Sequence, residues 1–538
     1  MKNIPSLLLG LIFFLIISLF VLSNRKSTPD ITTDITGGVH ETLLSGGGSD
    51  TPQVPSAVLT GNNENLRIPT VTVETVAPAD PIIPPQIVDK EKALELVTSL
   101  HSKVLVTLSW IVSLNNNNKK LLAWNAVSNS DIHIVHKLAR YLKYYIDKIT
   151  HHIDKNDHSV DNVALDELRN LMTNGYQCSV KEQSYQEIIS TKIQMDICSE
   201  IEWYKVVQLT WPEARVFIDV GANKGYLGSL FVGLWGGGGL GLSPLKLFSY
   251  CTEKGTWKKS RNPAGYCRDG YNDAISLYCP GGKRDAVTGQ CLETLHDIKV
   301  ASVDGSSYLA QVMNNIIQSA FPKVYEGKYW TYYNYAMSDV PSGKAYFTRQ
   351  TNDTVGYEGG HISNKGGSDL EEVDMTTVDH LSTRVLGIDR IDVLKIDAEG
   401  NDNKVIFGAS KFIRSSVGLL TFECGKGTQF SYSMIGEMDS IGFSCYSTSR
   451  AGLFKLNGQC MSRSFIDKKW DKGNVFCASR VRVPLVTLAL DALSFPIMIQ
   501  QSLNFTSSSS FMSADDFHKA YVNIKPFCQP FPACILDI

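Results

Sequence analysis

Hydrophobic positions recur along this chain with different periods, and each period predicts a different kind of element. Ile4–Leu22 is almost continuously apolar, and the first cations after it are Arg25 and Lys26. At 1.5 Å per residue, a helix of this length can just cross a bilayer core of about 30 Å. A cleaved signal peptide is the alternative, because its apolar part usually spans only about 7–15 residues. We expect residues 1–26 to form a short cytosolic tip and a retained signal-anchor helix.

The next segment, residues 27–88, has no sustained hydrophobic period. It is rich in Thr, Pro, Gly, Ser and Asn, and it contains the runs Gly46–Gly48 and Pro81–Pro85. Such a composition cannot bury enough apolar surface to offset the entropy lost on ordering. The sequence therefore predicts a disordered stem.

A spacing of three and four residues begins at about residue 89 and predicts helices. The apolar positions that follow it are Leu94, Val97, Leu100, Val104, Leu108, Ile134, Leu138, Leu142, Tyr145, Ile149 and Ile153. We assign residues 89–205 to a helical spacer or lid. His151, His152 and His158 fit a solvated helix end better than a metal site, because no nearby carboxylate or cysteine pattern completes a coordination set.

From residue 215 the pattern changes to a strand, a glycine-containing turn and a helix, which is the opening of a nucleotide-binding α/β unit. The apolar run Arg215–Asp219 ends on an acid, and Val220–Gly228 leads into apolar residues at helical spacing. Gly221 and Gly225 are expected to let the backbone approach a ligand closely, where a β-carbon would clash.

The turn has the pattern D-x-G-x-N-x-G rather than the G-x-G-x-x-G of dinucleotide enzymes. An acid at the strand end and an amide in the turn suit a ligand with an ammonium and a carboxylate group, such as S-adenosylmethionine. A tight turn with a helix-capping Asn is the alternative explanation. The cofactor contacts predicted here are Asp219, Gly221, Asn223, Gly225 and Tyr226.

A second acid is expected at the end of the next strand, where it would hold ribose hydroxyls. The best candidate is Asp304, at the end of Ile298–Asp304. Its distance from the first strand predicts an insertion over about residues 233–297. No C-x-x-C pair occurs in the insertion, so two disulfides of unknown pairing are favoured over structural zinc. The cysteines concerned are Cys251, Cys267, Cys279 and Cys291.

A further strand and turn is predicted over Trp330–Asp339. Its polar end would lie at the same edge of a parallel sheet as the two acids. Because an adenine ring could rest there, Ser338 and Asp339 are added to the predicted cofactor contacts.

The segment Ile391–Gly400 interrupts an apolar strand with three charged residues, Lys395, Asp397 and Glu399. Their period of two would place all three on one side of an extended backbone. Burying such groups without partners is costly. A structural ion pair between Lys395 and Asp397, with Glu399 near a helix start, is the alternative to a functional site.

We expect this segment to carry catalysis. Asp397 and Glu399 are the preferred base or acceptor-positioning pair, and Asp397 is also counted as a cofactor contact. Lys395 would orient one of them or meet an anionic acceptor, and His361 in a glycine-rich loop is a further candidate base. A divalent ion at Asp397, Glu399 and Glu423 is the less favoured reading, so no metal site is predicted.

Together these residues resemble the FkbM family of S-adenosylmethionine-dependent methyltransferases. The resemblance covers about residues 206–450, with F-I-D-V-G-A-N-K-G-Y at 217–226, A-M-S-D at 336–339 and D-V-L-K-I-D-A-E-G-N-D-N-K-V-I-F-G-A at 392–409. It implies an α/β fold with a Rossmann-like seven-strand sheet, S-adenosyl-L-methionine as cofactor, and O-methyl transfer, often to sugar or polyketide hydroxyls. The chain departs from the family in its cysteine insertion and in having Asp304-Gly305 where many relatives carry Glu-Pro.

The methyltransferase domain is accordingly placed at residues 206–480, with a C-terminal extension at 481–538. Further cysteines that are candidates for pairing are Cys424, Cys445, Cys460, Cys477, Cys528 and Cys534.

The composition of the chain bears mainly on the cellular compartment. The 538 residues carry a formal net charge of −3 without a basic block, so no nucleic-acid partner is expected. Twelve cysteines are many for a cytosolic protein. With the acceptor sequences Asn352–Thr354 and Asn504–Thr506, they favour a glycoprotein of the secretory lumen. We expect a single-pass membrane protein of the Golgi or endoplasmic reticulum with a lumenal catalytic domain.

The favoured function is therefore O-methyl transfer to a hydroxyl of a glycan or glycolipid, with the membrane bound through one N-terminal helix. One alternative is a methyltransferase for a non-sugar hydroxyl or a carboxyl acceptor. Another is a non-catalytic, membrane-tethered binding protein on a degenerate methyltransferase fold. The retained acids argue against the last alternative, because a binding module has no physical need to bury them. The sequence carries no signal for an oligomeric state.

Overall fold

The structure is a computed structural model, and the part described here lies within one compact unit, Ala77–Ile538. The described residues are 90–116, 134–135, 137–144, 146–147, 158–190, 200–237, 240–254, 276–279, 283–284, 291, 297–351, 360, 362–363, 366–425, 432–449, 452–463 and 472–496. The predicted anchor, the stem, His361, both glycosylation acceptors and the last 42 residues, 497–538, lie outside them. No helix of the described part is long and apolar enough to span a membrane.

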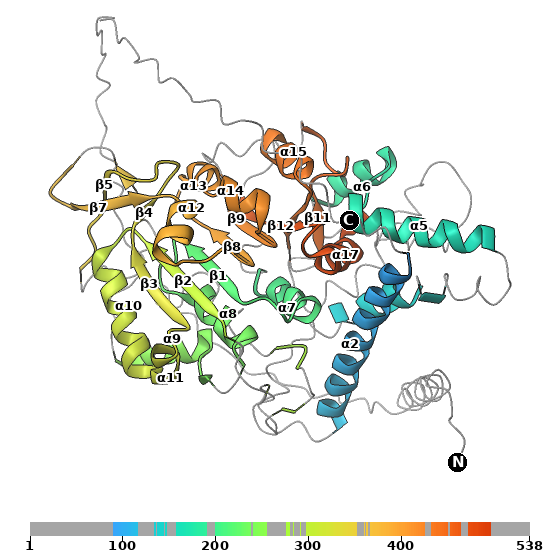
Figure 1. Cartoon of the computed structure of the whole chain (residues 1–538), viewed down its shortest axis with the longest axis horizontal. Coiled ribbons are helices and arrows are strands. Elements are labelled where there is room, and N and C mark those ends of the chain that lie inside the picture. Colours follow the sequence, from blue (N-terminus) through green and yellow to red (C-terminus); the bar gives the residue numbers. More distant parts are fainter. Residues whose placement is uncertain are drawn as a thin grey trace, which may run out of the picture. The chain divides into compact units, whose positions relative to one another are not determined.

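A mostly parallel sheet of eight strands forms the centre of the described part (Figure 1). In spatial order the strands are β11 (Leu453–Lys455), β10 (Phe443–Thr448), β12 (Lys472–Ser479), β9 (Leu419–Gly425), β8 (Val393–Ile396), β1 (Val216–Val220), β2 (Lys299–Asp304) and β3 (Trp330–Asn334). The strands from β9 to β3 are parallel, whereas β12 runs antiparallel between β9 and β10. The predicted α/β class holds, but the described sheet has eight strands rather than seven, because β11 pairs antiparallel with the edge strand β10.

The chain order of the strands reverses at β1, which pairs with β2 on one side and β8 on the other. Ligands of open α/β sheets bind at such a switch point, outside the carboxyl ends of the strands. The register places Asp219 of β1 beside Lys395 of β8. The topology thus brings two predicted site residues to one place, although they are far apart in the sequence.

Helices cover both faces of this sheet because alternate strand residues point to opposite sides. Phe217 and Val393 lie in one hydrophobic cluster with α7 (Glu200–Thr210), α8 (Tyr226–Trp235) and α17 (Pro484–Ala492). Ile218 and Leu394 lie in the other, with α13 (Asp402–Gly408), α14 (Ser410–Ser415) and α15 (Tyr432–Ser440). The remaining described helices are α2 (Lys90–Asn116), α5 (His158–Asn174), α6 (Val180–Ser190), α9 (Pro244–Glu253), α10 (Ser307–Ala320), α11 (Pro322–Glu326), α12 (Val378–His380) and a π-helical turn, Leu381–Val385.

A second, smaller sheet was not predicted from the sequence. Its order is β4 (Ala336–Met337), β7 (Leu370–Thr376), β5 (Lys344–Thr348) and β6 (Ile362–Ser363). The single strand expected at 330–339 is thus divided between the two sheets. The small sheet packs close to the end of β2, since a β-carbon on Gly305 would lie 2.4 Å from the Phe347 ring. It therefore borders the edge where Asp304 lies.

The helices that precede β1 pack into the same hydrophobic core as the large sheet. Val97 and Leu100 of α2 and Met172 of α5 are buried in the cluster that also holds Phe217. Gln186 of α6 is fully buried, and its Nε2 donates to the carbonyl oxygens of Lys455 and Cys460, each at 2.7 Å. The helical segment is thus bound to the β10–β11 end of the sheet by specific polar contacts.

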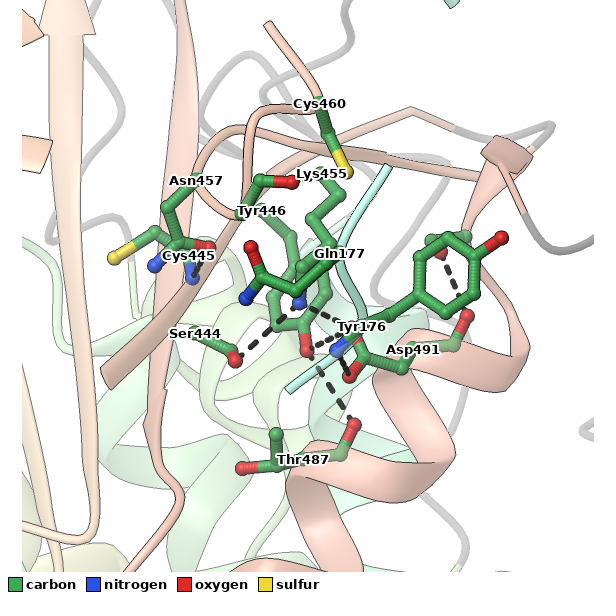
Figure 2. A network of polar contacts seen from close by, with 12 residues as sticks. Tyr176, Gln177, Ser444, Cys445, Tyr446, Lys455, Asn457, Cys460, Thr487 and Asp491 are labelled. Carbon is green, nitrogen blue, oxygen red and sulfur yellow. Dashed lines mark hydrogen bonds and ion pairs between the residues drawn. The ribbon is translucent and has the colours of Figure 1, made fainter. Parts of the chain in front are cut away.

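The turn between α5 and α6 is also held by a buried polar network (Figure 2). Lys455 Nζ lies 2.5 Å from Asp491 Oδ1, and Tyr446 donates its hydroxyl to the same oxygen at 2.7 Å. The backbone N–H of Tyr176 donates to the other oxygen of Asp491 at 2.9 Å. One carboxylate of α17 therefore connects β10, β11 and the α5–α6 turn.

Within the described residues, disulfides join Cys178 to Cys460, Cys279 to Cys291 and Cys445 to Cys477. They indicate an oxidising compartment of the secretory type. The expected second disulfide of the insertion does not include Cys251, which is a free, buried thiol in the core beside α8. Burial raises the pKa of the Cys251 thiol to about 12, so the reactive thiolate is suppressed.

Removing the Cys178–Cys460 disulfide with paired Cys→Ser substitutions should lower the free energy of unfolding by about 2–5 kcal/mol. This bond connects cysteines that are 282 residues apart, and so it restricts the unfolded chain strongly. Urea denaturation followed by circular dichroism measures the change. The matched control removes Cys279–Cys291, which are only 12 residues apart. The chain-entropy argument predicts about half the loss in this control, and equal losses would contradict it.

Candidate active site

One buried lysine joins the ends of β1 and β8 at the switch point. Lys395 Nζ lies 3.3 Å from Asp219 Oδ1 and 3.4 Å from Asp397 Oδ2. It also donates to the carbonyl oxygen of Gly221, in the glycine turn, at 3.1 Å. The structure thus brings together Asp219, Gly221, Lys395 and Asp397, which the sequence analysis selected from separate motifs.

The two carboxylates that contact Lys395 differ in exposure. The side chain of Asp219 is 1% exposed, whereas that of Asp397 is 38% exposed. Burial raises the pKa of Asp219 even though the Lys395 ammonium opposes the shift. For Lys395 itself, burial acts against the charged form, but the carboxylates of Asp397, Asp219 and Glu200 outweigh it and raise the pKa. Lys395 therefore stays charged, and Asp397 is the more accessible acid.

Glu423 is a further acid at this edge, at the end of β9. It pairs in register with Asn474 of β12 and shares a hydrogen bond with Asp397. Burial, followed by the charge of Asp397 and that hydrogen bond, raises the pKa of Glu423 to about 8. A carboxyl group with this pKa can accept a proton near neutral pH. The sequence analysis noted Glu423 only as a less favoured metal ligand.

Glu200 is a site residue that the sequence analysis missed, because it lies in the segment assigned to a spacer. Its side chain is buried at the start of α7, and Oε2 accepts a hydrogen bond from Asn474 Nδ2 at 2.7 Å. Burial raises the pKa of Glu200 to about 8, Lys395 opposes the shift, and Asp397, Asp219 and Glu423 add to it. An acid in the first turn of a mostly apolar segment was the sequence signal for it, and the structure shows that this helix is almost wholly buried.

The glycine turn is tied to the end of β2 through Asn223 and Asp304. The backbone N–H of Asn223 donates to Asp304 Oδ2 at 3.1 Å, and the N–H of Ser306 donates to Oδ1 at 2.9 Å. Burial raises the pKa of Asp304 to about 6, although both N–H groups lower it. Within the described part, Asn223 Oδ1 is buried and accepts no hydrogen bond. An acceptor of this kind has a place for a donor group of a ligand.

Gly221 and Gly225 are required by the packing of the turn against its own neighbours. Both have positive φ angles, +68° and +73°. A β-carbon on Gly221 would lie 1.7 Å from the carbonyl oxygen of Asp397, and one on Gly225 would lie 2.1 Å from the Tyr332 hydroxyl. The sequence analysis expected a ligand in these positions. In the structure the two glycines instead lie close to Asp397, just after β8, and to Tyr332 of β3. Their lack of a β-carbon lets the turn pack against the ends of these strands.

The structure does not extend the alternation of β8 to Glu399. The strand ends at Ile396, Glu399 has a φ of +49°, and its side chain is exposed. Asp402 holds this turn by accepting hydrogen bonds from the N–H groups of Ala398 and Gly400, at 3.1 and 3.2 Å. The expectation of three charges on one side of an extended backbone is therefore wrong for Glu399, because the strand ends at Ile396 and a tight turn begins at Ala398.

The remaining residues predicted for the site are Tyr226, Ser338, Asp339 and His361. Tyr226 is buried at the first position of α8, and Ser338 Oγ lies 2.9 Å from Asp339 Oδ1 just after β4. His361 lies outside the described residues. In the described part, no three His, Cys, Asp or Glu side chains are arranged to hold a metal ion.

A surface depression of about 570 Å³ lies away from this cluster. Its lining includes Asn174 of α5, Asp439 of α15 and Arg480, which directly follows β12. Because β12 is antiparallel to β9, its end lies at the amino-terminal edge of the parallel strands, where Ala478 pairs with Leu419. The depression is therefore at the opposite edge of the sheet from Lys395.

The order of the parallel strands, the glycine turn after β1 and the acids that end β1 and β2 are consistent with an α/β methyltransferase domain. Residues 219–445 match the family model described as the methyltransferase FkbM domain. The chain thus contains an FkbM methyltransferase domain, and it is an enzyme whose methyl donor is of the S-adenosylmethionine type. Searches of curated proteins and of solved structures found no match to the chain.

Proposed function

We propose that this enzyme is an O-methyltransferase of the secretory lumen, anchored through Ile4–Leu22, that methylates a hydroxyl group of a glycan or glycolipid. The observation that carries the proposal is the cluster of Lys395, Asp219 and Asp397 at the carboxyl ends of neighbouring parallel strands in the FkbM domain, with Glu423 at the end of the next strand. It lies beside the switch point, where a ligand of this fold binds.

The residues around the switch point fit S-adenosylmethionine by their chemistry. We propose that Asp304, at the end of β2, accepts from ribose hydroxyls, and Asn223 Oδ1 is an acceptor without a donor in the described part. Asp219 and Asp397 give this edge a surplus of negative charge over Lys395. When bound, the cofactor supplies a methyl group activated by a sulfonium cation, which such a surplus stabilises.

The chain's own contribution to the reaction is alignment and proton acceptance. In-line displacement depends mainly on holding the acceptor oxygen against the methyl carbon. As the new oxygen–carbon bond forms and the carbon–sulfur bond breaks, the hydroxyl proton must leave. Asp397 accepts that proton directly, or the Asp397–Glu423 pair accepts it once Glu423 has lost its own proton. Lys395 holds Asp397 in place from the buried side.

The charge distribution favours a hydroxyl acceptor over a carboxylate. Lys395 is already paired with two carboxylates, so it does not offer a free cation to an anionic acceptor. After burial, the neighbouring carboxylates raise the pKa of Glu423, and a carboxylate acceptor would meet the same repulsion. The disulfides indicate the secretory compartment, where glycans and glycolipids are abundant hydroxyl acceptors.

Titration with S-adenosylhomocysteine tests the cofactor site. We expect the whole chain to bind this ligand and Asp219→Ala to bind it about 10–150-fold more weakly, because a buried charged group is worth about 1.5–3 kcal/mol. Asp374→Ala, at an exposed position of β7, is the matched control and should bind like the wild type. Circular dichroism shows whether each variant is folded. Wild-type protein that ignores the ligand would contradict the proposal.

Transfer of a radiolabelled methyl group to a mixture of glycans, glycolipids and carboxylated sugars identifies the acceptor class. Methyl ethers resist mild base, whereas methyl esters are hydrolysed by it. We expect base-stable label on glycans or glycolipids. Label that base releases would identify a carboxyl acceptor instead and overturn the hydroxyl assignment.

A further inference from the structure

Glu200 lies outside the span that matches the FkbM domain, which begins at Asp219. The other carboxylates around Lys395 belong to that span, but Glu200 is supplied by α7, the helix that leads into β1. Its side chain is only 8% exposed. A buried acid costs free energy, so its position beside the reaction site calls for a physical role.

The register of the strands shows what Glu200 faces. Thr421 of β9 pairs with Lys395, and Glu423 lies two residues further along on the same face of the sheet. The hydroxyl of Tyr204 in α7 lies 2.8 Å from the hydroxyl of Thr421. Glu200 is one helical turn before Tyr204, on the same side of the helix. Since Tyr204 packs over Thr421, Glu200 packs over the next position on the same face of β9, which is Glu423.

Asn474 of β12 connects Glu200 with Glu423. It is the direct partner of Glu423 across β9 and β12, and its Nδ2 donates to Glu200 Oε2 at 2.7 Å. The charged and titratable groups that act on Glu200 are Lys395, Asp397, Asp219, Glu423 and, from its own helix, Tyr204. Those that act on Glu423 are Asp397, Glu399, Asp402 and, by the same interaction seen from the other side, Glu200.

We propose that Glu200 is a positioning residue for methyl transfer, and that its charge controls the pH at which the Asp397–Glu423 pair accepts the proton of the acceptor hydroxyl. The proposal rests on the proposed O-methyl transfer. Glu200 acts in two ways. It accepts a hydrogen bond from Asn474 and so holds this side chain beside Glu423. It also attracts the Lys395 ammonium, which Asp397 attracts as well. It does not need to touch the acceptor.

The electrostatics give the direction of this control. Burial raises the pKa of both Glu200 and Glu423 to about 8, so the protons of the cluster are released over a shared range near neutral pH. An ionised Glu200 disfavours the carboxylate form of Glu423, because the two negative charges repel each other. Removing the charge of Glu200 must therefore move the titration of Glu423 to lower pH.

A carbon-13 NMR titration of the whole chain, labelled at the glutamate carboxyl carbons, measures this directly. Loss of one resonance in Glu423→Gln assigns the Glu423 signal. In Glu200→Gln, which keeps an oxygen acceptor for Asn474, we expect the Glu423 midpoint to fall by about 0.5–1 pH unit. Glu200→Asp retains the charge and should restore much of the difference. Glu213→Gln, at an exposed carboxylate just after α7, is the matched control and should leave the midpoint unchanged.

The rate of methyl transfer to the glycan acceptor found by the labelling experiment gives the second readout. Its rising pH limb should move to lower pH in Glu200→Gln by the same amount, which lost packing alone would not produce. An unchanged Glu423 midpoint in a Glu200→Gln protein that still binds S-adenosylhomocysteine would overturn the proposal. A shifted midpoint without methylation of any glycan would refute the glycan acceptor and still support control of Glu423 by Glu200.

Discussion

Replacement of Lys455 by methionine should lower the free energy of unfolding by about 3–5 kcal/mol, one of the two largest effects that the structure predicts. The side chains of Lys455 and Asp491 are 1% and 0% exposed. The substitution leaves the Asp491 carboxylate buried without its cation, although Tyr446 and the Tyr176 N–H still donate to it (Figure 2). Urea denaturation followed by circular dichroism measures the loss.

The double variant Lys455→Met/Asp491→Leu distinguishes the effect of removing the whole ion pair from the effect of leaving one buried charge without its partner. It removes both charges, and we expect it to recover most of the lost stability, as buried pairs replaced by apolar side chains often do. Burial lowers the pKa of Lys455 although Asp491 opposes the shift, which shows that placing this ammonium in the core is costly. Lys344→Met, at an exposed ion pair, is the control and should leave stability unchanged. Equal stability of Lys455→Met and Lys344→Met would contradict the prediction.

Replacement of Asp397 by asparagine should lower the rate of methyl transfer by about 10²–10⁴-fold, because the variant loses the group that we propose accepts the hydroxyl proton. Binding of S-adenosylhomocysteine should be largely retained, since Asp397 is the half-exposed member of the cluster and Asp219 remains paired with Lys395. Parallel measurements of kcat and of the dissociation constant check both parts.

The residual activity of Asp397→Asn should also have a different pH dependence. The charge of Asp397 and its hydrogen bond are the largest causes, after burial, that raise the pKa of Glu423. Without them the Glu423 carboxylate forms at lower pH, so the rising limb of the rate should move to lower pH. Asp389→Asn, at an exposed position before β8, serves as the control. A variant that loses binding and rate in equal proportion would show that Asp397 only binds the cofactor.

The acids that end the strands were accessible from the sequence because of a general property of parallel sheets. An apolar run that closes on an acid predicts a side chain at the carboxyl edge, and parallel strands share that edge. Asp219, Lys395 and Asp397 meet there in the structure. The prediction failed for Glu399, because the chain leaves the extended conformation at a turn that the charged pattern did not reveal.

Other parts of the site depend on pairings that no local pattern encodes. Asn474 reaches the cluster because β12 inserts antiparallel between β9 and β10, and the short strands of the second sheet come together from distant segments. Glu200 reaches Asn474 because a helix before β1 packs across β9. Periodicity shows which face of an element is buried, but it does not show which other element covers that face.

The sequence by itself determined the α/β class, the glycine turn after β1 and the acids at the ends of the parallel strands, because these follow from local patterns of polarity and glycine. The tertiary structure alone decided that Lys395 pairs with two carboxylates, that Glu423 shares a hydrogen bond with Asp397, and that Glu200 joins them. The physical reason is that pKa values and ion pairs depend on distance and burial, which are set by packing between segments far apart in the chain.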